Sequence, residues 1–299
     1  MNSAATTTLI PGRHAHTTLA GVKRRLARPA HWLAIAAIAT VLAATATGTI
    51  SAHAVATATR QAFGAGPGSA AVMTTAATLP LKGKTVGIDP GHNGRNGDYP
   101  HYLATQVWNG RAWEDCDTTG TQTDGAHTYT EALFNWRVAS YLKADLLKDG
   151  AKVVMTRPNN TGHGPCVDKR SFIINGAHAN VAVDIHADGA YCAGCRGFAL
   201  LEPVADGPND KVIHSSRTLG ADIKAAMLAL KRMPVSNYDG SNGISYRNDL
   251  AGLNLTKVPK ILIEVGNMKN AADVRLLTSP TFQQQVARAL LNAIIKFLK

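Results

Sequence analysis

Residues 181–188 read VAVDIHAD, an apolar run that places a histidine, His186, near its end. A second run of the same kind, VGIDPGHNG at residues 86–94, presents His92 just after a Pro-Gly turn. Each run has the length and apolar content of a buried strand, and the carboxyl ends of parallel strands form the sheet edge where ligands bind. Two imidazoles at one sheet edge are half of the ligand set of a common metal site. The two runs therefore predict a parallel α/β sheet with a metal site at its edge.

The rest of the chain alternates helical and strand patterns. A helix is expected from Glu131, with Thr130 as its N-cap and Gly150 at its end, because apolar residues recur there every three or four positions. Further strands are expected at 151–156, 197–201 and 260–265, and further helices at 209–230 and 280–298. This alternation predicts a single α/β domain with a mostly parallel sheet and helices on both faces.

The N-terminal region has the composition of an export signal. Basic residues at 23–28 precede an almost uncharged stretch from Trp32 to Ile50, and SAHA at 51–54 offers a cleavage site of the A-x-A type. The alternative is an uncleaved membrane anchor, although the apolar stretch is near the lower limit of spanning length. We therefore expect a secreted protein that meets the membrane only through this segment.

These patterns divide the chain into three parts. Residues 1–54 are expected to be the signal peptide, residues 55–82 a flexible linker rich in Ala, Thr, Gly and Ser, and residues 83–299 the folded catalytic domain. The formal net charge is +11, but much of it lies before residue 60. No basic helix interleaved with aromatic residues is visible, so nucleic acid is not expected as a partner. An anionic cell-wall polymer remains compatible with the charge.

Export gives the four cysteines the opportunity to form disulfides. The pairing that we favour joins Cys116 to Cys166 and Cys192 to Cys195. A structural zinc knuckle that uses all four is the main alternative, but a zinc ribbon needs two C-x-x-C motifs and the chain has one. A thioredoxin-like redox site is a weaker alternative, because no helix pattern begins at Cys192.

Two glutamates complete a candidate site. Glu131 opens a helix, where an acidic side chain is commonly explained by the helix dipole. Glu264 follows three branched apolar residues in ILIEVGN at 261–267, where an unpartnered carboxylate is costly to bury. Burial would raise the pKa of Glu264, as suits a general base, unless the residue is a structural partner of Arg170 or Arg247.

The four residues together suggest a catalytic zinc site. Two histidines and one glutamate form a common open zinc site, and a further carboxylate would move the proton. Asp188 could orient the ring of His186, as carboxylates beside metal ligands often do. The chain has neither the H-E-x-x-H helix of zincins nor the G-x-S-x-G elbow of serine hydrolases.

At these positions the chain resembles the N-acetylmuramoyl-L-alanine amidases of the Amidase_3 family, in particular the secreted actinobacterial type. The matching pieces occur in the family's order and are DPGHNG at 89–94, TE at 130–131, DIHAD at 184–188 and IEVGNMKN at 263–270. The resemblance implies a mostly parallel, six-stranded sheet. It also implies Zn²⁺ bound by His92, Glu131 and His186, with Glu264 as the catalytic carboxylate. The implied reaction is hydrolysis of the amide between N-acetylmuramic acid and L-alanine in peptidoglycan, for cell-wall remodelling or recycling.

The chain departs from the family's pattern at two positions. Asp184 and Asp188 stand where the family commonly has Ser and Asn. The segment 96–128 lacks helical periodicity, so no helix that blocks the metal is expected there.

A monomer acting on peptidoglycan or muropeptide fragments is expected. The alternatives are a zinc carboxypeptidase on stem peptides and a non-catalytic wall-binding protein. The residues expected to contact substrate are Asp188, Arg247, Asn254 and Asn267.

Overall fold

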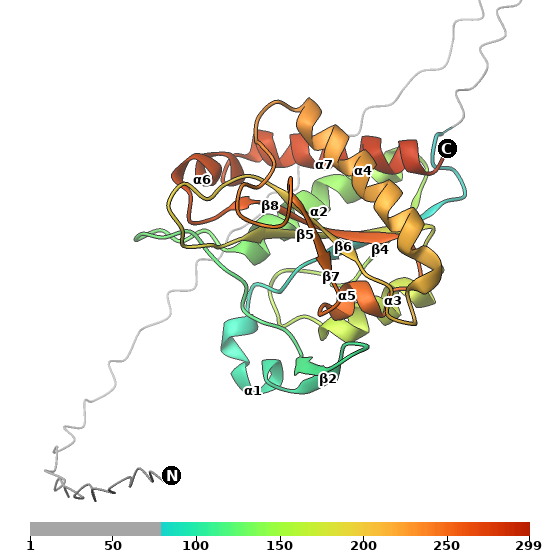
Figure 1. The fold of residues 1–299 in the computed structure, drawn as a ribbon, viewed down its shortest axis with the longest axis horizontal. Helices are drawn as coiled ribbons and strands as arrows, with labels where there is room; N and C mark the ends of the chain where they lie inside the picture. The colour runs from blue at the N-terminus through green and yellow to red at the C-terminus, as the bar shows by residue number, and fades with distance from the viewer. Residues whose placement is uncertain (1–78) are drawn as a thin grey trace, which may run out of the picture. The chain divides into compact units, whose positions relative to one another are not determined.

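Six strands form the central sheet, in the order β4-β1-β5-β8-β6-β7 (Figure 1). The computed structural model describes residues 79–299, so the expected signal peptide and most of the expected linker lie outside the described residues. The strands are β1 Thr85–Pro90, β4 Lys152–Met155, β5 Val181–Asp188, β6 Ala199–Pro203, β7 Ile244–Arg247 and β8 Lys260–Asn267. Neighbouring strands pair in parallel except at β6, which is antiparallel to β8. The expected mostly parallel, six-stranded sheet is confirmed.

Helices cover both faces of the sheet, as the alternation predicted. One face packs against the long helices α2 (Glu131–Lys148), α4 (Ile213–Ala229) and α7 (Pro280–Phe297), which together form the main apolar core. The opposite face is covered by α3 (Val167–Gly176) and the short α5 (Ala251–Asn254). The remaining helical turns are η1 Asn96–Asp98, α1 Pro100–Leu103, η2 Asp210–Val212 and α6 Ala271–Leu277. Among the described residues, no helix combines the length and apolarity needed to cross a membrane.

Alternation along the strands separates apolar from polar residues. Val183 and Ile185 of β5 point into the main core, whereas Ala182 packs against Ile174 of α3 on the other face. Because successive strand residues point to opposite faces, Asp184, which follows two residues after Ala182, and then His186 lie on the α3 and α5 side. The sheet therefore presents its polar side chains to the face that α3 and α5 cover incompletely.

Helix α2 begins and ends where the sequence indicated. The Thr130 hydroxyl accepts a hydrogen bond from the backbone N–H of Leu133 at 3.3 Å, and Gly150 takes a φ of 89° after the last turn. The cap satisfies one of the free N–H groups of the first turn. It also fixes the position of Glu131, the first residue of the helix.

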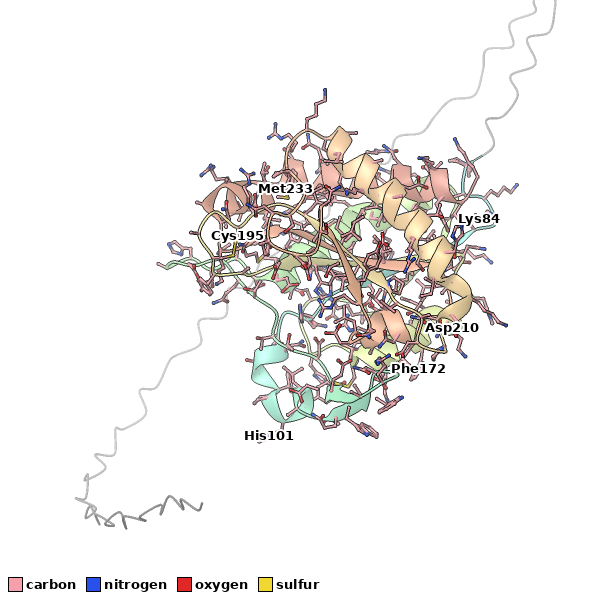
Figure 2. The ribbon with its side chains drawn as sticks, viewed as in Figure 1. Lys84, His101, Phe172, Cys195, Asp210 and Met233 are labelled. Carbon is pink, nitrogen blue, oxygen red and sulfur yellow. A yellow bond between two sulfur atoms is a disulfide. The ribbon has the colours of Figure 1, made fainter. Side chains whose placement is uncertain are left out.

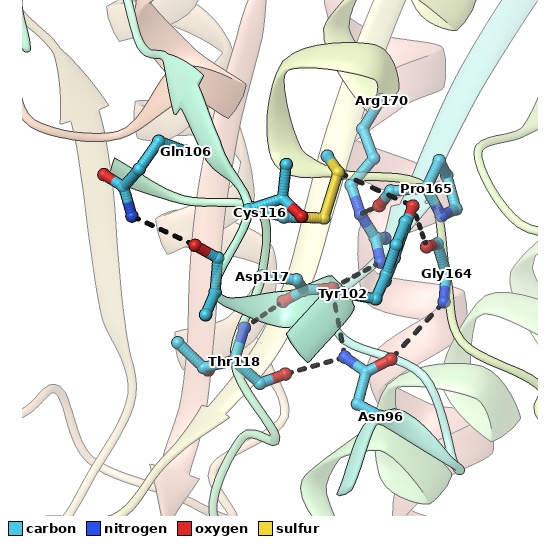
Figure 3. The surroundings of a disulfide bond; sticks show 12 residues. Asn96, Tyr102, Gln106, Cys116, Asp117, Thr118, Gly164, Pro165 and Arg170 are labelled. Carbon is cyan, nitrogen blue, oxygen red and sulfur yellow. Dashed lines mark hydrogen bonds and ion pairs between the residues drawn. A yellow bond between two sulfur atoms is a disulfide. The ribbon is translucent and has the colours of Figure 1, made fainter. Parts of the chain in front are cut away.

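The segment 96–128 contains elements that the sequence did not predict. It holds η1, α1 and a hairpin of β2 (Gln106–Trp108) and β3 (Trp113–Asp115), and β7 was also missed. Cys116, just after β3, is joined to Cys166 at the start of α3 (Figure 3). The second disulfide joins Cys192 to Cys195 in the loop after β5, so the pairing favoured from the sequence is the one in the structure.

Replacing both Cys116 and Cys166 by Ser should lower the free energy of unfolding by about 4 kcal/mol, the value for a loop of about 50 residues in the chain-entropy model. Urea unfolding of the double variant measures this loss. The matched control replaces Cys192 and Cys195, whose separation is three residues, and should lose much less. Equal losses in the two double variants would show that loop closure does not explain the stabilisation.

Candidate functional site

Three side chains predicted as metal ligands meet at the carboxyl end of the sheet. Each of His92, Glu131 and His186 offers a ligand atom within 4.8 Å of the other two. Each oxygen of the Glu131 carboxylate lies near one of the two rings. Oε1 is 2.8 Å from Nδ1 of His186, and Oε2 is 3.4 Å from Nε2 of His92. The site is therefore assembled from a turn after β1, the first turn of α2 and the end of β5.

His92 is held in one orientation by the turn that follows β1. Its backbone has a φ of 56°, in the left-handed region that non-glycine residues seldom adopt and that is often found at functional sites. Its Nδ1 lies 3.0 Å from Oδ1 of Asp117 and 3.1 Å from the Thr118 carbonyl. These contacts occupy one ring nitrogen and leave Nε2 facing Glu131, as expected when a carboxylate orients a metal-binding imidazole.

The Glu131 carboxylate is buried and receives backbone hydrogen bonds on both oxygens. The N–H of Thr121 donates to Oε2 at 2.9 Å, and the N–H of Ala187 donates to Oε1 at 3.3 Å. Such bonds favour the charged form of the carboxylate. Burial opposes this effect, but His92 and His186 together hold the pKa of Glu131 well below its usual range. The position of this acid at a helix start is thus explained by the site as well as by the helix dipole.

The orienting partner of His186 differs from the expected one. Oδ1 of Asp184 lies 3.3 Å from Nε2 of His186, and the other ring nitrogen faces Glu131. Asp188, which the sequence suggested for this role, instead accepts a hydrogen bond from the backbone N–H of Gly189 at 2.6 Å. The expected contact of Asp188 with the ring is therefore not found, and Asp184 is the carboxylate that lies beside His186.

Two glycines give the histidine rings their space. A Cβ at Gly91 would overlap the imidazole of His186. Gly120 has a φ of 69°, and a Cβ there would come 2.6 Å from Cδ2 of His92 and 2.8 Å from Oε2 of Glu131. Close approach of the main chain to the site thus depends on residues without side chains.

The electrostatics of the three ligands fit a bound cation. Burial alone would lower the pKa of His92, but Glu131 and Asp117 raise it to about 9. The pKa of His186 is likewise well above its usual value, because Asp184 and Glu131 outweigh burial. The surrounding carboxylates therefore favour positive charge at the rings, and two imidazoles with one carboxylate are a donor set that suits zinc. The residues present fit the metal that the sequence suggested.

Glu264 lies beside the metal-ligand cluster on the neighbouring strand. It is the register partner of His186 in the parallel pairing of β5 with β8. Its buried Oε2 has no hydrogen-bond partner among the described residues, and burial raises the pKa of Glu264 to about 8. The structural partners considered for it are engaged elsewhere: Arg170 pairs with Asp89 and Asp117, and Arg247 pairs with Asp249.

A buried chain of charges connects the two candidate histidine ligands. Arg170 bridges Asp117 and Asp89 at 3.0 and 3.1 Å, while Lys260 bridges Asp89 and Asp184 at 2.7 and 3.1 Å. The full order is His92, Asp117, Arg170, Asp89, Lys260, Asp184 and His186. Each imidazole is thus oriented by a carboxylate, each carboxylate is held by a cation, and both cations meet at Asp89.

Sequence reasoning did not identify Asp117, Lys260 or the role of Arg170. One signal was available, since Lys260 opens the apolar run KILIEV at 260–265. A charged residue at the start of a buried strand needs a buried partner. Asp117 gave only a weaker signal, its position directly after Cys116.

A cavity of about 330 Å³ opens onto the site from the α5 side. His92, His186 and Glu264 line it, together with Arg247. Further wall residues come from the β2–β3 hairpin and from α5 with its flanking residues, including Glu114, Asp115, Leu250 and Leu253. The cavity thus joins the candidate metal ligands to a partly apolar groove large enough for a small part of a polymer.

The four residues expected to contact substrate fall into two groups. Arg247 lines the cavity, and Asp188 lines a neighbouring hollow that also reaches Glu264. Asn254 is buried and donates to the Asn248 carbonyl, and Asn267 is buried and donates to the carbonyls of Ala190 and Cys195. Both amides support loops, and neither lines these hollows, so the structure does not place Asn254 or Asn267 where the sequence suggested.

Asp117→Asn should weaken zinc binding about 10- to 100-fold, the usual effect of changing a residue that orients a metal ligand. The physical reason is that Nδ1 of His92 loses its charged partner. Competition with a chromophoric chelator measures the affinity. Asp222→Asn, which changes an aspartate paired with Lys296 on the opposite side of the sheet, is the matched control. Unchanged zinc affinity in a folded Asp117→Asn protein would contradict the orienting role.

Comparisons with known proteins agree with this geometry. Residues 86–296 match the model of the Amidase_3 family, described as N-acetylmuramoyl-L-alanine amidase. The chain is 36% identical over 236 residues to the N-acetylmuramoyl-L-alanine amidase Rv3717 of Mycobacterium tuberculosis, covering 76% of this chain and 92% of that protein.

Solved structures give the same result. The amidase Ami1 from Mycobacterium smegmatis aligns with a TM-score of 0.67 and 35% identity, over 73% of this chain and 98% of that one. Ami1 from Mycobacterium abscessus, in its apo form, aligns with a TM-score of 0.65 and 36% identity, over 73% of this chain and all of that one. On the sequence, the fold and these matches together, the chain belongs to the Amidase_3 family and is an N-acetylmuramoyl-L-alanine amidase.

Proposed function

We propose that this amidase is zinc-dependent and acts outside the cytoplasm on peptidoglycan or its muropeptide fragments. The bond cleaved is the amide between the lactyl group of N-acetylmuramic acid and L-alanine of the stem peptide. The observation that carries the proposal is the cluster of His92, Glu131 and His186 with the unpartnered Glu264 beside it. Names of relatives that include cell wall amidases support an extracytoplasmic place of action.

His92, Glu131 and His186 would hold the zinc ion, and three protein ligands leave one position open for chemistry. When bound, zinc lowers the pKa of water and polarises a carbonyl oxygen. The protein's own contribution is to keep both rings and the carboxylate in place. Asp117 would do this for the ring of His92 and Asp184 for the ring of His186.

Glu264 has the properties required of the proton carrier. Its Oε2 lacks a hydrogen-bond partner among the described residues, so it is free to accept a proton from the attacking water. The water oxygen forms a bond to the lactyl carbonyl carbon, and the C–N bond then breaks. Glu264 returns the proton to the departing amine of L-alanine, which leaves a lactyl carboxylate on the sugar and an intact stem peptide.

Arg247 and Asp188 are the proposed substrate contacts. Arg247 lines the cavity and is held by a two-point ion pair with Asp249, at 2.7 Å for each bond. Because Asp249 occupies Nε and Nη2, the guanidinium would offer Nη1 to an acceptor group of the stem peptide. Asp188 lies beside the catalytic face, where it would meet polar groups of the same peptide. We propose that the protein works as a monomer, since all the candidate groups come from one chain.

Removal and return of zinc tests the proposal. Protein stripped with a chelator should release no stem peptide from muropeptides, and addition of one equivalent of zinc should restore release. A metal-replete protein that leaves every muropeptide intact would contradict the proposal and would favour a wall-binding role. The presence of all four chemical groups in one cluster argues against that role.

A further inference from the structure

Two tryptophans lie exposed on the outer face of the β2–β3 hairpin. Trp108 and Trp113 are direct partners in the antiparallel pairing, and their ring centroids are 5.7 Å apart in an edge-to-face arrangement. Trp108 is 46% exposed and Trp113 is 67% exposed. Exposed large aromatic side chains are costly in water, and a contacting pair of them on one face is a common feature of binding surfaces.

The hairpin is fixed to the catalytic domain by its inner face and its tip. The Glu114 carboxylate accepts from the N–H of Ala251 at 3.3 Å, and the Asn109 amide donates to the Asp249 carbonyl at 3.2 Å. Val107 packs beside the Cys116–Cys166 disulfide. The rings are therefore presented on a supported platform and not on a free loop.

The same hairpin forms a wall of the catalytic cavity. Glu114 and Asp115, which directly follow Trp113, line that cavity. Asp115 both borders the cavity and lies on the same face of the hairpin as the rings, and its carboxylate accepts a hydrogen bond from the amide of its pairing partner Gln106. Aromatic rings with an amide and a carboxylate next to them match the chemistry of a sugar, whose C–H faces pack on rings and whose hydroxyls bond polar groups.

We propose that this face, defined by Gln106, Trp108, Trp113 and Asp115, binds the glycan strand of the substrate beyond the sugar that carries the scissile bond. The inference rests on the proposed function, because a polymer held at the catalytic cavity must leave it along a wall. The β2–β3 wall continues from the cavity to the exposed rings. The ligand class is a β-1,4-linked chain of N-acetylated hexosamines.

Binding of chitohexaose, a soluble β-1,4-linked chain of N-acetylglucosamine, tests the proposal without requiring hydrolysis. Trp113→Ala should weaken binding roughly five- to tenfold, the loss expected for one stacked ring. Trp113→Tyr should keep most of the affinity for chitohexaose, because it places an aromatic ring at the same position. The same variant serves as a check on folding. Phe172→Ala, which removes an exposed aromatic ring from α3 (Figure 2), is the matched control and should bind as the native protein does.

Hydrolysis gives a second readout. The quantity to compare is the ratio of kcat/KM on intact sacculi to kcat/KM on a small muropeptide that lacks a glycan extension. This ratio should be lower in Trp113→Ala than in the native protein. In Phe172→Ala it should be unchanged. Chitohexaose affinity equal in the native and Trp113→Ala proteins would overturn the proposal. Binding to isolated stem peptides or to another protein, without binding to chitohexaose, would overturn it as well. Binding to chitohexaose through Trp113 by a protein that cleaves nothing would sustain this proposal and refute the zinc amidase mechanism.

Discussion

Glu264→Gln should lower turnover of a muropeptide by about 10²- to 10⁴-fold, the range that a positioned acid or base supplies. Glutamine keeps the shape of the side chain but neither accepts nor returns a proton. Zinc content should be unchanged, because His92, Glu131 and His186 are the proposed ligands and Glu264 only faces them across the β5–β8 pair. Rates of stem-peptide release and metal analysis of the same preparation give both quantities.

Glu202→Gln is the matched control for this variant. Glu202 is a second buried glutamate with a raised pKa, on the adjacent strand β6, and it does not line the catalytic cavity. Its replacement should leave both turnover and zinc content close to the native values. Loss of zinc together with activity in Glu264→Gln would reassign Glu264 as a ligand, and full activity would remove it from the mechanism.

Lys260→Met should reduce the free energy of unfolding by about 3–5 kcal/mol, the usual result of removing one partner from a buried ion pair. Lys260 is 1% exposed and bridges Asp89 and Asp184, so its removal leaves two buried carboxylates without this counter-charge. Urea unfolding at neutral pH measures the loss. Zinc binding should weaken in the same variant, because Asp184 orients His186.

Lys296→Met is the matched control. Its ammonium pairs with Asp222 but is largely exposed, and exposed pairs typically contribute about 1 kcal/mol or less. A loss in Lys260→Met as small as in this control would contradict the account of the buried charge chain.

The penalty of Lys260→Met should also depend on pH. Burial alone would raise the pKa of Asp89, but Lys260 and Arg170 outweigh it and hold the pKa far below the usual 3.8. A carboxylate whose pKa is depressed by folding stabilises the protein above its unfolded pKa and loses that contribution as the pH falls. Without Lys260 the carboxylate protonates more readily, so the difference between native and variant proteins should shrink as the pH falls below 4 (about the unfolded pKa). A constant difference from neutral to acid pH would contradict this.

The long elements of the fold were predictable because they repeat a local pattern. Helix α2 has a capping threonine, regular apolar spacing and a terminal glycine, and β5 and β8 are eight-residue strands whose first halves are mainly apolar. The short strands β2, β3 and β7 have three or four residues each, too few to display a period. Their positions depend on tertiary contacts, such as the disulfide beside the hairpin.

The part of the candidate site that was predictable consists of residues at the ends of strands and at the start of a helix. His92, His186 and Glu264 sit at or near strand ends, where chemistry gathers in α/β proteins. The charge chain is different, because Asp89 and Lys260 are 171 residues apart and no local pattern connects them. The partner of His186 could not be chosen from the sequence either. Asp184 and Asp188 are each two residues away from His186, so the spacing does not show which carboxylate points toward the ring.

The central claim is most directly tested by the masses of the products that the zinc-loaded protein makes from a defined muropeptide. Two products are expected: the complete stem peptide with a free L-alanine amine, and the sugar with a free lactyl carboxylate. Together they gain the mass of one water. Peptides shortened from their carboxyl end, with the first alanine still attached to the sugar, would contradict the account and identify a carboxypeptidase.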